Sequence, residues 1–190
     1  MIHETLVFLK NSLNAHLHAS GKPLDPKEDQ VVFPVGQNTE NLTFKLGAIS
    51  VMMLNIEQEE VLRAPNLYRR TMPDGSVQRV NPEIRLNLYV LFVSHYQQYE
   101  DSLRNLSAVI EYFQNHRIFT HEDAPDLNES IEQLMIELIT LPFAEHNEVW
   151  NSLRVSYRPS VLYKVKTLVF DGDALPTAPL MAEQDIKVLE

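Results

Sequence analysis

The sequence predicts an α+β fold with a mixed, largely antiparallel sheet of about four to five strands and helices packed on it. Stretches with helical spacing of apolar residues alternate with stretches rich in β-branched and aromatic residues, in the order α, β, β, α, β, α, β. The strongest strand is apolar on both faces, which is typical of a central strand. The length of 190 residues fits one domain. We expect residues 1–171 to form this domain and residues 172–190 to be an extended C-terminal tail.

Three stretches are expected to be helices: residues 2–20, Tyr99–Asn115 and residues 143–154. In the first, leucines recur every three or four residues and form one apolar stripe, and Gly21 and Pro23 are typical of a helix end. The second has the clearest amphipathic pattern. Its apolar face comprises Tyr99, Leu103, Leu106, Val109, Ile110 and Phe113.

Four stretches are expected to be strands of the sheet: residues 48–56, residues 84–94, residues 134–141 and Ser160–Phe170. For the third, a helical interpretation of residues 129–137 stays open. In residues 84–94, apolar side chains occupy both odd and even positions, so both faces of this strand are expected to be covered. A further strand is expected after the turn Pro73-Asp74-Gly75, in which proline presets φ and glycine supplies a positive φ. Residues 24–47 are expected to be irregular around the short apolar piece Val31-Val32-Phe33.

Charge and composition exclude several classes of partner. The chain has 16 Lys and Arg against 26 Asp and Glu, a net charge of −10, so binding of nucleic acid or of an anionic membrane by charge is not expected. The absence of cysteine excludes disulfides and thiolate metal sites. The apolar runs are too short to span a bilayer, and the N-terminus does not resemble a secretory signal. We therefore expect a soluble protein that is made in the cytoplasm.

The sequence contains none of the common motifs for catalysis or cofactor binding. It has no Gly-x-Ser-x-Gly, no phosphate-binding glycine loop and no His-Glu-x-x-His. The nearest approach to a metal site is the group His116, His121, Glu122 and Asp123, which is more typical of a polar loop after a helix. We expect no enzymatic activity, no cofactor and no metal. A small metal-dependent hydrolase that uses this loop is kept as an alternative.

Arginines are concentrated in one segment of this acidic chain. Five of the nine arginines lie there: Arg63, Arg69, Arg70, Arg79 and Arg85. The segment straddles the Pro73-Asp74-Gly75 turn, so it is expected to form a β-arm and is a candidate partner interface, because guanidinium groups pair well with carboxylates. An alternative interpretation is a solvated hairpin whose arginines keep an edge strand soluble. An adaptor that binds an acidic protein through this arm is a second alternative function.

The segment from Trp150 to Pro159 is expected to pack on the sheet. Trp150 and Leu153 are three residues apart on one helix face. The following Tyr157-Arg158-Pro159 is expected to be extended, because a residue before proline avoids the helical conformation. The candidate structural core here comprises Trp150, Leu153, Tyr157, Arg158 and Pro159.

Four stretches together resemble a known family. In chain order they are Asn87-Leu88-Tyr89-Val90-Leu91-Phe92, the helix from Tyr99 to Phe113, Trp150-x-x-Leu153, and Tyr157-Arg158-Pro159-Ser160-Val161-Leu162-Tyr163-Lys164-Val165. In this combination the chain resembles the cap proteins, or tube and sheath terminators, of extracellular contractile injection systems such as the antifeeding prophage and virulence-cassette particles. The resemblance extends from the N-terminal helix to about Phe170 and leaves out residues 24–47 and the tail.

The resemblance implies a tail-terminator-like fold and a structural function. Such caps are similar to the terminators of contractile phage tails, in which a six-fold ring closes the inner tube and holds the last sheath layer. For this chain it implies a homo-oligomeric, hexameric ring that contacts tube and sheath proteins, without cofactor, catalysis, nucleic acid or membrane. Ring closure needs a heterologous interface whose rotation returns to its start. The N-terminal helix, the arginine arm, the tail and an exposed sheet edge are candidates for such contacts.

Overall fold

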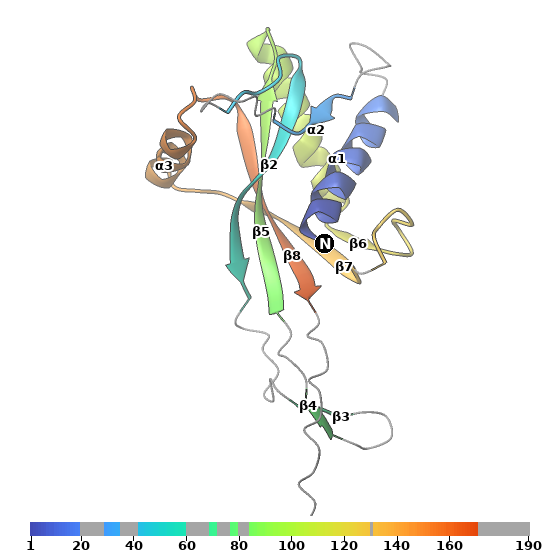
Figure 1. Cartoon of the computed structure of the whole chain (residues 1–190). Coiled ribbons are helices and arrows are strands. Elements are labelled where there is room, and N and C mark those ends of the chain that lie inside the picture. The colour runs from blue at the N-terminus through green and yellow to red at the C-terminus, as the bar shows by residue number, and fades with distance from the viewer. Residues whose placement is uncertain are drawn as a thin grey trace, which may run out of the picture.

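The computed structural model describes residues 1–19, 29–34, 42–59, 69–71, 77–79, 84–129 and 131–170, without the side chains of residues 69–71, 77–79 and 167–170 (Figure 1). These residues contain the helices α1 (Ile2–Ala19), α2 (Tyr99–Asn115) and α3 (Phe143–Leu153). Each helix agrees with the sequence prediction to within one residue at either end. The expected stop at Gly21 and Pro23 and the expected tail lie outside the described residues.

Six strands form one sheet in the order β1-β2-β5-β8-β7-β6. Their bounds are β1 (Val31–Val32), β2 (Ala48–Gln58), β5 (Ile84–His95), β6 (Ile118–Thr120), β7 (Gln133–Ile139) and β8 (Ser160–Phe170). Neighbouring strands are antiparallel except β1 and β2, which are parallel. The predicted α+β class and mixed, largely antiparallel sheet are confirmed. The sheet has more strands than the four to five expected, because the short edge strands β1 and β6 give little signal in the sequence.

A separate two-stranded sheet consists of β3 (Arg69–Thr71) and β4 (Val77–Arg79). Figure 1 shows this hairpin beyond the ends of β2 and β5 that lie away from the helices. Its register pairs Arg69 with Arg79 and Arg70 with Gln78. The strand expected after the turn at residues 73–75 is therefore β4, and the turn itself lies outside the described residues.

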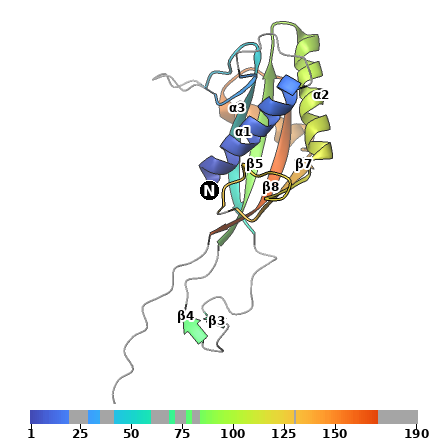
Figure 2. The ribbon, with the colours of Figure 1, turned by 90° about the vertical axis from the view of Figure 1, so that its right-hand side faces the viewer.

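Helices cover both faces of the sheet, as the sequence of β5 predicted. α1 and α2 pack on one face and α3 packs on part of the other (Figures 1 and 2). The large core lies under α1 and α2 and includes Phe8, Leu13, Val90, Phe92, Phe113 and Tyr163. The small core lies under α3 and comprises Phe44, Leu91, Val93, Trp150 and Leu162, with partly buried neighbours. Since burying one such side chain stabilises a fold by about 1.5–3 kcal/mol, β5 is held from both sides.

The edge strand β1 is fixed to α1 by one buried side chain. The Asn14 amide donates to the Val31 carbonyl at 2.9 Å, and the Val31 N–H donates to Oδ1 of Asn14 at 2.8 Å. These two bonds satisfy the backbone of a residue that is fully buried at the sheet edge. After Phe33 the chain reaches Pro34, which has no N–H to continue the ladder. The strand is therefore short, and its position is well defined.

Candidate assembly surfaces

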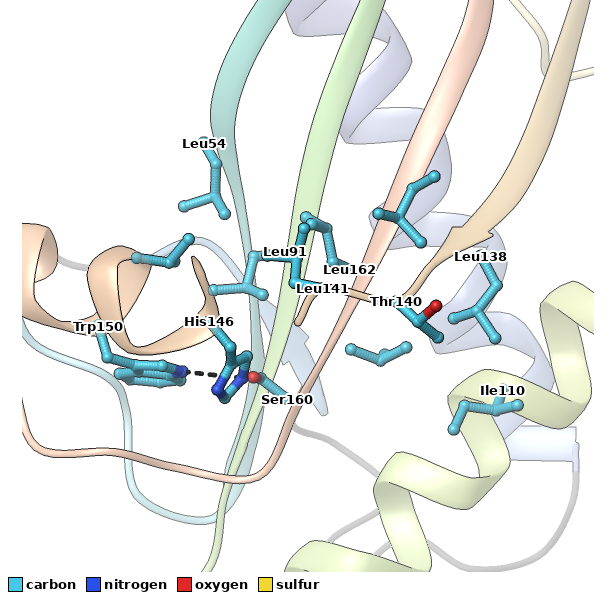
Figure 3. Close-up of a pocket in the computed structure, with 13 residues that line it drawn as sticks. Leu54, Leu91, Ile110, Leu138, Thr140, Leu141, His146, Trp150, Ser160 and Leu162 are labelled. Atoms are coloured by element: carbon cyan, nitrogen blue, oxygen red, sulfur yellow. Dashed lines mark hydrogen bonds between the residues drawn. The ribbon is translucent and has the colours of Figure 1, made fainter. Parts of the chain in front are cut away.

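An aromatic cluster holds α3 on the sheet. Trp150 is only 5% exposed, and its ring centroid lies 6.2 Å from that of Phe44 and 5.4 Å from that of Tyr157. Its indole N–H donates to Nε2 of His146 at 3.3 Å, the bond drawn in Figure 3. The helix ends at Leu153, and the C-cap residue Arg154 adopts a left-handed conformation with φ of 54°.

The other members of the segment from Trp150 to Pro159 differ in their burial. Leu153 is half-buried against the small core, and Pro159 is buried, with its carbonyl accepting a hydrogen bond from the Ser94 N–H at 2.9 Å. Arg158 is half-buried. Tyr157 is 57% exposed although its ring contacts Trp150. The segment thus joins the small core to the surface.

A groove of about 310 Å³ lies where β7 ends beside β8, and we call it the β7 groove. Its lining includes Leu91, Ile110, Leu138, Leu141, Trp150 and Leu162. Figure 3 shows Ile110 of α2 and Leu138 of β7 on one side, and His146 and Trp150 of α3 on the other. The hydroxyl of Ser160 in its wall is buried without a hydrogen-bond partner among the described residues. The lining is mostly apolar, with Thr140, His146 and Ser160 as its polar members.

Sequence reasoning missed this groove. It assigned Ile110 to the apolar face of a packed helix, but the structure leaves Tyr99, Leu103 and Ile110 exposed. The apolar face of α2 is wider than its contact with the sheet, and buried Val109 and Phe113 mark the part that packs. The width of this apolar face is the feature of the sequence that could have indicated an exposed apolar surface on α2.

The same sheet face is polar away from α3. Lys164 of β8 donates to Oε2 of Glu57 at 2.8 Å, and the Tyr89 hydroxyl donates to the same oxygen at 2.7 Å. The hydrogen bond from Lys164, followed by that from Tyr89, lowers the pKa of Glu57 below its ordinary value. The bond to Glu57 in turn raises the pKa of Lys164. A second cross-strand ion pair joins Lys166 and Glu137.

The structure brings together three of the five candidate arginines. Arg69 and Arg70 lie in β3 and Arg79 lies in β4, so they share the small hairpin. Arg85 lies in β5 of the main sheet, where its carbonyl accepts the Glu59 N–H at 2.9 Å. Arg63 lies outside the described residues.

Two of the histidines, His16 and His116, belong to packing contacts. Tyr112 of α2 stacks on His116, with ring centroids 4.5 Å apart, and lies 4.8 Å from the ring of His16. In the loop after β6, Asp123 accepts a hydrogen bond from the Thr120 hydroxyl at 3.1 Å. Within the described residues, no three His, Asp or Glu side chains are placed to hold a metal ion. Nor does any helix in that part of the chain have the length and apolar character needed to cross a membrane.

The profile of one protein family, the Pvc16 N-terminal domain, matches residues 5–184. Among solved structures, the chain is similar to the PVC sheath/tube terminator of an extracellular contractile injection system in its extended state, with a TM-score of 0.56 and 13% identity. The match covers 97% of this chain and 65% of that one, so the chain spans about two thirds of the terminator's length.

The tube-terminating cap of the anti-feeding prophage is also similar, with a TM-score of 0.46 and 16% identity, over 72% of this chain and 49% of that one. No curated protein matches the chain. The family match extends over nearly all of the sequence, and the PVC sheath/tube terminator has the same fold as this chain. The resemblance seen in the sequence is therefore confirmed by the family profile and by the fold. The chain belongs to the Pvc16 N-terminal domain family.

Proposed function

We propose that this chain is a structural cap that terminates the inner tube of a contractile injection particle and anchors its last sheath layer. The match to the Pvc16 N-terminal domain over residues 5–184 carries the proposal. The fold shared with the PVC sheath/tube terminator supports it, since nearly all of this chain takes part in the alignment. The protein is made in the cytoplasm and becomes part of the particle.

A non-catalytic function agrees with the chemistry of the described surfaces. The β7 groove is mostly apolar, and its buried Ser160 hydroxyl has no base within hydrogen-bond distance among the described residues. The hydrolase alternative gains no support, because the loop around His121 holds no metal-ligating cluster in the part of the chain that the structure describes.

The cap is proposed to act as a hexameric ring that contacts tube and sheath proteins. Side-by-side copies close a ring only through a heterologous interface. The β3–β4 hairpin is a candidate for the contact with tube or sheath, because it carries Arg69, Arg70 and Arg79 in a chain of net charge −10. Such a basic element favours an acidic partner surface.

Deleting the gene for this protein from a particle-producing strain tests the function. We expect particles of irregular length with open tube ends, and restoration of uniform length by the wild-type protein. The double variant Arg69→Glu, Arg70→Glu should fold normally but fail to restore length, whereas Arg104→Glu, on the exposed face of α2, should restore it. Uniform, closed particles in the absence of the protein would contradict the proposed function.

A further inference from the structure

Two exposed apolar sites lie at opposite edges of the sheet. At one edge is the β7 groove, where Ile110 is 38% and Leu138 is 47% exposed. At the other edge Phe33, which follows β1, is 36% exposed. Because β6 pairs only with residues 133–135, β7 is the outermost described strand beside Leu138. Among the described residues, nothing covers either site from the side of the sheet.

The two sites lie at the same height along the strands. One row of paired residues crosses the sheet from the groove, and it consists of Ile139, Leu162, Leu91 and Met52. At the far edge, the pairing of Val32 with Ser50 places Phe33 beside Val51, one residue before Met52. One residue corresponds to about 3.3 Å along a strand. The register thus aligns the aromatic side chain at one edge with the groove at the other.

Phe33 is held in place before any partner arrives. The two hydrogen bonds between Asn14 and Val31 fix Val31, and the parallel pairing with β2 fixes Val32. The groove is equally well supported, since the Trp150 cluster and the end of β7 form its walls. Association of two preorganised apolar sites costs little conformational entropy.

We propose that Phe33 of one copy packs into the β7 groove of the next copy. The inference rests on the proposed function, which requires a ring. Rotation about a ring axis does not change the position of any atom along that axis. In a ring whose strands run along the axis, Phe33 and the β7 groove must therefore lie at the same position along the strands. The register meets this condition. Repetition of the contact around the axis closes the ring and buries both sites in every copy.

Engineered cysteines can test the contact directly, because the natural chain has none. Phe33→Cys and Leu138→Cys proteins are made separately, mixed, and treated with a short bismaleimide cross-linker. In an equal mixture up to about half of the monomer band should move to a dimer band, because each copy has about an even chance of the complementary neighbour in a head-to-tail ring. Each protein alone should stay monomeric on the gel. A protein carrying both substitutions should give a ladder that ends at the size of the ring.

The matched control replaces Leu138→Cys by Asp126→Cys, an exposed site on the loop after β6, and should give no dimer with Phe33→Cys. Circular dichroism establishes that each variant is folded. Cross-linking is measured both on assembled tubes and in concentrated free protein, while co-sedimentation of the wild-type protein with tubes reports on the proposed function. Absence of the mixed dimer under both conditions overturns the contact even where the protein binds tubes. Efficient dimers from either single variant alone overturn it too, because they would indicate an isologous contact.

Discussion

The two faces of the sheet differ in how completely helices cover them. On one face, α1 and α2 together bury the large core, whose side chains come from both helices and all six strands of the main sheet. On the other face, α3 covers only the region around Trp150, and the remainder carries the charged group of Glu57, Tyr89 and Lys164. The same strands serve both environments because their side chains alternate. The comparison indicates that the first face supplies stability and that the second leaves surface for contacts.

The largest expected effect is a difference in the free energy of unfolding between alanine variants of two adjacent residues of β5, Phe92 and Leu91. Phe92→Ala should lower the free energy of unfolding by about 4 kcal/mol, because its fully buried ring packs against Phe113 at 5.2 Å between centroids. Leu91→Ala should cost about 2.5 kcal/mol, since Leu91 lines a groove that is already open. Denaturant unfolding monitored by circular dichroism measures both. Equal losses of unfolding free energy in the two variants would show that the two faces of the sheet contribute equally to stability.

Asn14→Ala should lower the free energy of unfolding by about 2 kcal/mol. The change leaves the N–H and carbonyl of buried Val31 without their partners. Asn11→Ala, at an exposed position on the same helix, is the control and should change stability by less than about 0.5 kcal/mol. Similar effects of the two substitutions would mean that β1 is not held by this side chain.

Alkaline titration should separate the buried phenols from the others. Burial raises the pKa of Tyr96 and of Tyr163 to about 12, from 10.0. Because the folded-state values are raised, the stabilisation from these neutral phenols is fully present below pH 10 and is lost as the pH rises through about 12. Tyrosinate absorbance should show late ionisation of Tyr96 and Tyr163 in the native protein, alongside Tyr112, whose pKa burial also raises, and a Tyr163→Phe variant should lose one of these late groups. Two phenols that ionise with the rest would contradict the burial of these side chains.

His146→Ala tests the attachment of α3. The substitution removes the acceptor of the Trp150 indole N–H, which should cost about 1 kcal/mol. Trp150 is the sole tryptophan, so its fluorescence should shift to the red in this variant and stay unchanged in His121→Ala, an exposed control. An unchanged spectrum in His146→Ala would show that the bond does not hold the helix.

Glu57→Gln should have the smallest effect, because the ion pair with Lys164 lies on the uncovered part of the sheet and is screened by water and salt. The lowered pKa of Glu57 means that its contribution is present above pH 4.5 and disappears as the pH falls through the lower folded-state value. A thermal melt should show a slight loss at neutral pH and none in strong acid. A loss as large as that of His146→Ala would place Glu57 among the structural contacts.

Periodicity predicted the elements that pack on both sides of the sheet. β5 and α2 are long, and their apolar residues follow the spacing of a strand and of a helix, so local pattern and tertiary environment agree. β1 was missed because two residues cannot show a period, and its position depends on hydrogen bonds with Asn14, 17 residues away. β6, with three residues, is nearly as short.

The candidate surfaces were less accessible to sequence reasoning. Concentration of arginines identified β3 and β4, but only strand pairing separates Arg85, in the main sheet, from Arg69 and Arg79 in the hairpin. The β7 groove joins residues from two helices and four strands, and no local pattern relates Leu54 to Ile110. Its alignment with Phe33 follows from the register of the whole sheet.

Cryo-electron microscopy of assembled particles, with this protein carrying a small fused label, tests the central claim most directly. The account predicts labelled density as a closed ring at one end of the inner tube, in contact with the last sheath layer and absent from the rest of the particle. Label distributed along the tube or sheath, or missing from purified particles, would contradict it.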